Sequence, residues 1–245
     1  MPNPTASMLV IGDEILSGRT RDSNMHYLAQ HLTKVGIDLK EVRVVLDITE
    51  DIVDSVQILS KRYDYVFTSG GIGPTHDDIT TDAIGMAFGV KVEIDKEARA
   101  ILEKNYQGKG LELNESRLRM ARIPCGAILI NNSVSAAPGY NIFNVFVMAG
   151  VPSVFQAMFD SVLPSLLAGT PIQSRTLTVM RGEGEIALKL AKFAKKNQNV
   201  SFGSYPFQLD SEYGTNIVIR GVDPVTLDGL CAALLDQLLK ENHES

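Results

Sequence analysis

Short apolar stretches alternate along most of the chain with longer segments in which apolar residues recur at helical spacing. In residues 22–36, for example, Leu28, Leu32 and Val35 follow one another at intervals of four and three. The apolar stretches predict strands at 7–12, 38–47, 64–70, 127–130 and 144–150. The helical spacing predicts helices at 22–36, 49–63, 79–89, 96–107, 114–122 and 151–167. Strands that alternate with helices predict an α/β fold with a mostly parallel sheet covered on both faces.

The pattern changes after residue 168. A half-exposed strand, an amphipathic helix, two further strands and a final helix follow, a βαββα order typical of a small α+β domain. These elements are predicted at 174–180, 184–199, 200–206, 213–221 and 223–241. We therefore expect one domain over 1–168 and a small one over 169–245.

The composition narrows the classes of partner. With 23 basic and 29 acidic residues the net charge is −6, and no basic block is present, which argues against nucleic acid. No apolar run is long enough for a membrane helix, and the N-terminal residues lack the pattern of a secretory signal. Cys125 and Cys231 have no metal-binding spacing, so we expect two buried thiols in a cytoplasmic protein.

Polar, glycine-containing segments follow the predicted strands. They lie at 12–24, at Asp47, at 69–83, and at 136–141 together with 148–153. Each is expected to follow a strand and precede a helix, so all should meet at the carboxyl edge of the sheet. Ligands bind at this edge in parallel α/β proteins.

The segment "SGGIGPTHDDITTDA" (69–83) carries the most distinctive chemistry. Gly70, Gly71 and Gly73 precede a predicted helix, where free backbone N–H groups form a site for phosphate or carboxylate; a plain turn is the alternative. Asp78 fits a capping box with Thr75, which leaves Asp77 without a capping role.

Carboxylates beside an anion-binding loop repel phosphate unless a cation lies between them. Mg²⁺ bound by one or two carboxylates and by substrate phosphates satisfies both charges. Asp13 and Glu14 contribute carboxylates from the first polar segment, where Arg19 and Arg21 are either phosphate partners or surface residues. His76 is interpreted as a loop histidine.

The same residues resemble a known family. "GGIGPTHDDIT" is similar to the GGxGPTxxDxT signature of the molybdopterin-binding (MoCF) domain. "GDEILSGRTRDSN" and "MAGVPS" resemble its CinA-like branch, which includes the N-terminal MoCF-like domain of eukaryotic FAD synthase. The resemblance covers about residues 5–168, and the segment that contains "GSYP" resembles the part that follows this domain.

The resemblance implies a three-layer α/β fold that binds a small-molecule nucleotide or pterin. It implies catalytic roles for Asp78, Asp47 and Glu14, and binding of Mg²⁺ or another divalent metal by Asp78, Asp77 and Glu14. The ligand-binding residues are predicted to be Gly70, Gly71, Gly73, Pro74, Thr75, Asp13, Asn24, Pro138, Gly139, Gly150 and Pro152. Related domains form dimers or trimers, so a homo-oligomer is expected.

Two functions follow from the resemblance. One is metal-dependent hydrolysis of the pyrophosphate of a nucleotide such as ADP-ribose or FAD. The alternative is a molybdopterin-binding protein linked to molybdenum cofactor biosynthesis, without turnover. A third interpretation treats the acidic loop as a remnant on an inactive scaffold.

Overall fold

The computed structural model describes residues 2–209 and 212–239. The chain forms two compact units, Met1–Gly169 and Thr170–Ser245. Each unit has its own hydrophobic core, and each is described by itself below.

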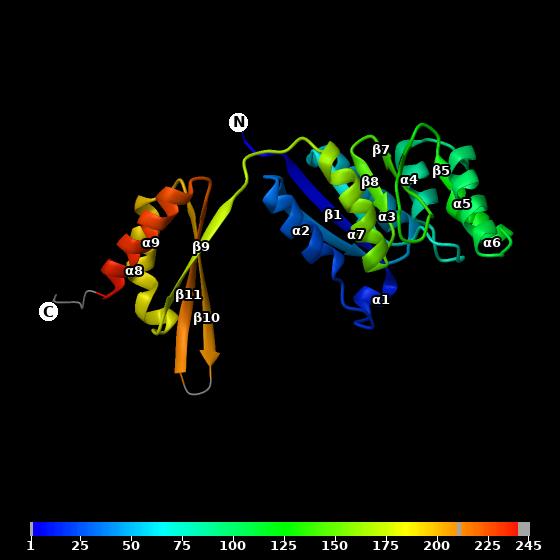
Figure 1. Cartoon of the computed structure of the whole chain (residues 1–245). Coiled ribbons are helices and arrows are strands. Elements are labelled where there is room, and N and C mark those ends of the chain that lie inside the picture. Colours follow the sequence, from blue (N-terminus) through cyan, green and yellow to red (C-terminus); the bar gives the residue numbers. More distant parts are fainter. Residues whose placement is uncertain (1, 210–211, 240–245) are drawn as a thin grey trace. The chain divides into compact units, whose positions relative to one another are not determined.

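The first unit is built on a six-stranded sheet (Figure 1). The strand order is β2 (Asp38–Val45), β1 (Thr5–Ile11), β3 (Tyr65–Ser69), β8 (Val145–Met148), β7 (Gly139–Ile142) and β6 (Ile128–Ile130). The first four strands run parallel, whereas β7 is antiparallel to both β8 and β6. The sequence-based prediction of a mostly parallel α/β sheet is therefore confirmed.

Helices cover both faces of this sheet because the strands are apolar on both faces. Met8 and Val10 of β1 pack toward α2 (Asn24–Lys34) and α7 (Pro152–Val162), which lie side by side. Leu9 and Ile11 pack toward α3 (Thr49–Arg62) and α4 (Thr80–Phe88). The alternation of side chains along a strand thus distributes one apolar stretch between two cores.

Several local elements differ from the prediction. Residues 13–16 form a short helix, α1 (Asp13–Leu16). The helix expected at 114–122 is divided into α6 (Glu115–Leu118) and the 3-10 turn η1 (Arg119–Ala121), and the helix expected to end at 167 ends in the 3-10 turn η2 (Leu163–Ser165). A two-stranded sheet of β4 (Val92–Ile94) and β5 (Arg122–Pro124) was not predicted; it flanks the predicted helix α5 (Lys96–Gly108).

The segment 136–141 was predicted to be a loop that precedes a helix, and this was wrong. Its second half belongs to β7, where Tyr140 pairs with Val147 across the antiparallel ladder. Gly139 allows the close approach, because a Cβ on this residue would lie 2.5 Å from the carbonyl oxygen of Val147. Strand pairing between distant segments, rather than local pattern, determines this element.

The second unit is a three-stranded antiparallel sheet with two helices on one face. The elements are β9 (Gln173–Val179), α8 (Glu183–Lys196), β10 (Ser201–Leu209), β11 (Glu212–Gly221) and α9 (Pro224–Leu239), and the strand order is β10-β11-β9. Ile217 and Ile219 of β11 pack against both helices. Asp223 accepts a hydrogen bond from the Thr226 N–H at 3.0 Å and so caps α9. The predicted end of this helix, at 240–241, lies outside the described residues.

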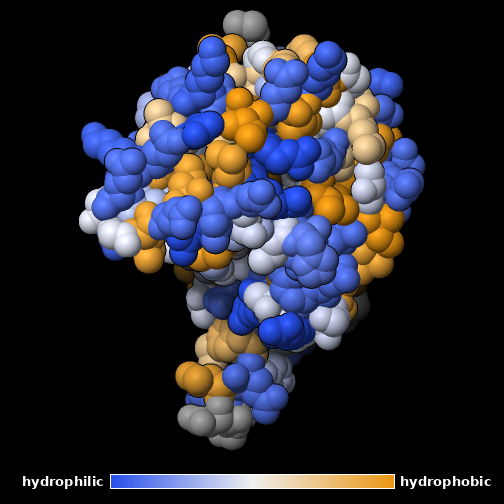
Figure 2. Space-filling model, turned by 90° about the vertical axis from the view of Figure 1, so that its right-hand side faces the viewer, coloured by the Kyte–Doolittle hydropathy of each residue, from blue (hydrophilic) through white to orange (hydrophobic). Residues whose placement is uncertain are grey.

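Within residues 2–209 and 212–239, no helix is long and apolar enough to cross a membrane. The face of the molecule shown in Figure 2 is mainly hydrophilic, and hydrophobic residues lie between the polar ones in small groups. Both cysteines are free thiols, but the expectation that both are buried was wrong: Cys125 is exposed and Cys231 is half-buried. Cys125 follows the short strand β5 directly, at the edge of the two-stranded sheet.

Candidate functional site

A cavity of about 560 Å³ lies where the parallel strands end. Its wall includes residues that follow β1, β2, β3 and β8, as parallel topology predicts. The segments that contribute are 11–14, Asp47, 70–73 and 149–152. The structure therefore brings together at one edge most of the polar segments that the sequence pattern singled out.

Asp13 and Asp47 are joined by two reciprocal hydrogen bonds. The Asp13 N–H donates to Asp47 Oδ2 at 3.0 Å, and the Asp47 N–H donates to Asp13 Oδ1 at 3.0 Å. This pair links the segment after β1 to the segment after β2. Burial of Asp47 raises the pKa of its carboxyl, and the negative charges of Asp13, Glu14 and Asp77 raise it further, against the lowering effect of the Asp13 N–H. Asp47 is thus the acid at this edge that binds a proton more strongly than usual.

Four carboxylates line the cavity: Glu14, Asp47, Asp77 and Asp78. Among the described residues of its wall there is no Lys, Arg or His. The described residues also contain no group of three His, Cys, Asp or Glu side chains placed to hold a metal ion. The predicted trio of Asp78, Asp77 and Glu14 therefore lines one cavity without forming a preformed three-carboxylate site.

Backbone hydrogen bonds to two other segments hold the glycine loop, residues 70–73, in position. The Gly70 N–H donates to the Met148 carbonyl at 3.1 Å, and the Thr80 N–H donates to the Gly71 carbonyl at 3.0 Å. Gly70 and Gly71 have φ values of 115° and 69°, which favour glycine. A Cβ on Gly71 would also lie 2.1 Å from Thr80 Oγ1. The backbone conformation and the close contacts therefore require glycine at both positions.

The amides of the same loop are free of protein acceptors. Nothing in the part of the chain that the structure describes accepts a hydrogen bond from the N–H groups of Gly71, Ile72 or Gly73. The helix that was expected directly after these glycines, α4, begins only at Thr80, so the three amides do not lie at its N-terminus. Successive unpaired amides of a loop can by themselves bind an anion. The interpretation of the loop as more than a turn rests on these amides.

Asp78 closes a turn inside the loop instead of capping the helix. Thr75 donates to Asp78 Oδ2 from its N–H at 2.8 Å and from its Oγ1 at 2.5 Å. Since α4 begins at Thr80, Asp78 lies before the helix cap, and the capping alternative does not describe it. Gly73 lies against this carboxylate, because a Cβ on Gly73 would be 2.7 Å from Asp78 Oδ2.

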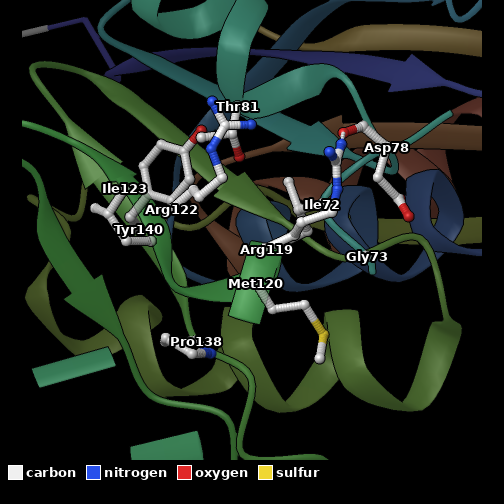
Figure 3. Close-up of a pocket in the computed structure, with 10 residues that line it drawn as sticks. All are labelled: Ile72, Gly73, Asp78, Thr81, Arg119, Met120, Arg122, Ile123, Pro138 and Tyr140. Atoms are coloured by element: carbon white, nitrogen blue, oxygen red, sulfur yellow. Dashed lines mark hydrogen bonds between the residues drawn. The ribbon is translucent and has the colours of Figure 1, made fainter. Parts of the chain in front are cut away.

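A second, much smaller cavity of about 10 Å³ adjoins the glycine loop, since Ile72 and Gly73 line both cavities. Figure 3 shows Arg119 between Asp78 on one side and Tyr140 and Arg122 on the other. Arg119 Nη2 donates to the Asp78 carbonyl oxygen at 3.4 Å, and Arg122 forms two hydrogen bonds with Asp82 at 2.8 and 2.6 Å. Burial raises the pKa of the Tyr140 hydroxyl far above its usual range. Arg119 was not predicted, because it lies in a segment with an ordinary helical pattern.

Asn24 connects three elements at the start of α2. Its Nδ2 donates to Ser69 Oγ and to the Gly150 carbonyl, both at 2.8 Å. The side chain is buried and also lines a side pocket of about 50 Å³ that adjoins the main cavity. The structure thus places this predicted residue beside the ligand cavity.

The other predicted residues are distributed around the site. Gly70, Gly71, Gly73, Gly150 and Pro152 line the main cavity, and Pro138 lines the small one. Thr75 donates a hydrogen bond to the Asp78 carboxylate, and the Asp13 N–H donates one to the Asp47 carboxylate. Pro74 is exposed on the loop. Gly139 was predicted to contact ligand but is a buried strand residue. Met120, Ser135, Val154 and Met158 line the cavity although they lie outside the segments that the sequence singled out.

Comparison with known proteins gives two family matches. Residues 7–168 match the model described as "Probable molybdopterin binding domain", and residues 171–244 match "FAD synthase, middle domain". A "Probable FAD synthase" of Caenorhabditis elegans is 34% identical over 261 residues; the alignment covers 96% of this chain and 50% of that protein. The chain therefore spans half the length of that relative. A protein of Pyrobaculum calidifontis is 31% identical, with 97% of this chain and 95% of that protein covered.

Among solved structures, the protein CinA with unknown function from Thermoplasma acidophilum has 32% sequence identity and a TM-score of 0.61. The match covers 66% of this chain and 98% of that structure. The family matches and these relatives agree with the motif of the glycine loop. The chain belongs to the molybdopterin-binding (MoCF) domain family, in its CinA-like branch with similarity to FAD synthase.

Proposed function

We propose that this protein hydrolyses the pyrophosphate bond of a nucleotide such as ADP-ribose or FAD with the help of a divalent metal ion. The observation that carries the proposal is the composition of the cavity wall. The unpaired amides of Gly71, Ile72 and Gly73 adjoin Glu14, Asp47, Asp77 and Asp78.

The charges in the cavity argue for a metal ion. A bound pyrophosphate would meet four carboxylates, and the described part of the cavity wall offers no cationic side chain to offset them. The negative charges of the carboxylates and the phosphates repel one another, so a cation is required between them. Mg²⁺ commonly uses one or two carboxylates and completes its coordination with water and substrate phosphates.

The donor set fits such an ion. Carboxylate oxygens are hard ligands, which Mg²⁺ and Mn²⁺ prefer. Because the described residues form no three-carboxylate cluster, the phosphates of the substrate would supply the remaining ligands. One or two of the carboxylates of Asp78, Asp77 and Glu14 would hold the ion. When bound, it would neutralise the phosphate charge and make a nearby water molecule more acidic.

The residues of the chain have separate roles in this scheme. The loop amides donate hydrogen bonds to phosphate oxygens and orient the pyrophosphate. Asp47 accepts a proton from the attacking water, because its raised pKa makes it a stronger base than an ordinary carboxylate. Asp13 fixes the position of Asp47 through the two reciprocal hydrogen bonds.

Pterin binding without turnover is the second candidate, and the name of the matched family favours it. The two candidates differ in whether a bond is broken. The cavity admits either ligand type, since its wall combines apolar residues such as Met120 and Met158 with the acids.

The test is a panel of ADP-ribose, FAD and related nucleotide diphosphates, incubated with the full chain and Mg²⁺, Mn²⁺ or Co²⁺. We expect release of AMP that stops on addition of EDTA and returns with excess metal. Binding of these ligands or of a pterin without release of any monophosphate would refute the hydrolase and leave the binding protein.

A further inference from the structure

One buried acceptor beside the cavity has no donor in the described residues. Asn24 is 2% exposed, and its Oδ1 has no hydrogen-bond partner in the part of the chain that the structure describes. The other end of the same amide is fully used, because Nδ2 donates to Ser69 Oγ and to the Gly150 carbonyl.

The orientation of this amide is fixed by chemistry. The Gly150 carbonyl oxygen can only accept a hydrogen bond, so the amide nitrogen of Asn24 must face it. Reversal of the amide would place two acceptors against each other. Oδ1 is therefore held in place as an acceptor, and leaving a buried acceptor unpaired is unfavourable.

The space beside Asn24 is small and is lined by both polar and apolar residues. The side pocket of about 50 Å³ shares Ile11, Glu14, Thr20, Gly150 and Pro152 with the main cavity, so the two are adjacent. Its volume admits a few water molecules or a small polar group but not a purine or pterin ring. Thr20, Arg21 and Ser23, which also line it, supply hydrogen-bond donors.

The charges of the pocket distinguish between ligand groups. Glu14 and Asp22 line it together with Asn24, and the two carboxylates disfavour a phosphate. An amine N–H would satisfy Oδ1 but could not accept from Thr20 or Arg21. A hydroxyl group donates one hydrogen bond and accepts others, so it can satisfy Oδ1 and a donor such as Thr20 or Arg21 at the same time.

We propose that the side pocket binds a ribose hydroxyl of the nucleotide and that Asn24 Oδ1 accepts its hydrogen bond. The proposal rests on the proposed function, because it assumes that the pyrophosphate of the same ligand lies at the glycine loop. Asn24 then makes the site selective for ribonucleotides, since a ligand without this hydroxyl leaves the buried acceptor unpaired.

The first test uses the full chain with Mg²⁺ and calorimetric measurement of affinity. The probes are ADP and its 2′-fluoro-2′-deoxy and 3′-fluoro-3′-deoxy analogues. Fluorine has nearly the size of a hydroxyl group but cannot donate a hydrogen bond. We expect one of the two analogues to bind at least about tenfold more weakly than ADP.

The second test combines that analogue with two variants. In Asn24→Ala the difference between ADP and the analogue should fall below about threefold, because no acceptor remains to be left unpaired. Asn144→Ala is the matched control, since Asn144 Nδ2 also donates to two backbone carbonyls, those of Ser60 and Tyr63. This control should discriminate as the unmodified chain does.

The outcomes separate the two proposals. If both analogues bind as tightly as ADP while nucleotide cleavage persists, the ribose site is refuted and the proposed function stands. Full discrimination in Asn24→Ala would refute the role of Asn24. If no nucleotide binds or is cleaved, both proposals fail together. The comparison of ADP with the analogues needs only the unmodified chain, so a variant that does not fold leaves the proposal testable.

Discussion

Asp13 and Asp47, 34 residues apart, each donate a backbone hydrogen bond to the carboxylate of the other at 3.0 Å. The pair joins the ends of two parallel strands and places the Asp47 carboxyl on the wall of the cavity. An acid held in this way is fixed in position and still carries a raised pKa, because burial and three neighbouring carboxylates act on it.

Substitution Asp47→Asn tests this acid directly. Hydrolysis should fall by about 10²–10⁴-fold, the usual contribution of a general base. The folded state raises the pKa of the Asp47 carboxyl. The protonated carboxyl therefore contributes to the stability of the fold below the unfolded-state pKa, and this contribution is lost as the pH rises through the folded-state pKa. Asp47→Asn should therefore melt at the same or a higher temperature than the unmodified chain at pH 7, and the gain should disappear in acid. A fall in Tm at pH 7 with full activity would contradict both roles.

Substitution Asp78→Asn should abolish nucleotide hydrolysis while the fold survives. An asparagine Oδ1 can still accept the hydrogen bonds of Thr75, but the negative charge proposed to hold the metal ion is lost. Turnover at saturating Mg²⁺ and the circular dichroism spectrum are the measurements. Asp54→Asn, on an exposed position of α3, is the control and should have unchanged turnover. Unmodified activity and metal dependence in Asp78→Asn would contradict the assignment.

Two glycines of the same loop should respond differently to alanine. In Gly73→Ala the new Cβ would displace the Asp78 carboxylate, so nucleotide affinity should fall by about tenfold or more, equivalent to about 1.4 kcal/mol, with little change in Tm. Gly71→Ala should lower Tm, because this residue has φ 69° and lies against Thr80. Calorimetry and thermal melting measure the two effects. If Gly73→Ala and the unmodified chain have equal affinity for each nucleotide and pterin tested, the loop is only a turn and has no role in binding.

We also expect residues 1–168 to fold without the rest of the chain. Both cores of the first unit are formed within residues 6–166, so truncation leaves them intact. The truncated protein should unfold in a single cooperative transition and retain nucleotide binding. Loss of all turnover on truncation, with binding and assembly intact, would instead place chemistry in the second unit.

The sequence alone determined the layers of the fold and the edge at which the site lies. Short apolar stretches and a helical spacing of 3.6 residues are local properties, so β1, β3, α2 and α7 could be predicted from the chain. The glycine loop and its acids were identified in the same way, because they interrupt this apolar pattern. The rule that ligands bind at the carboxyl ends of parallel strands then brought Glu14, Asp47 and Asp78 to one edge.

Only the tertiary structure decided how these residues are held. Strand β7 depends on pairing with β8, and a segment that contains Gly139 and Asn141 carries no strand pattern of its own. The pairing of Asp13 with Asp47, the position of Arg119 beside Asp78, and the contact of Asn24 with Gly150 across 126 residues all join segments far apart in the chain. Such contacts depend on how the packed layers align and not on any neighbour in sequence. For this reason the chemistry of the site was predictable by residue type, whereas its free acceptor at Asn24 was not.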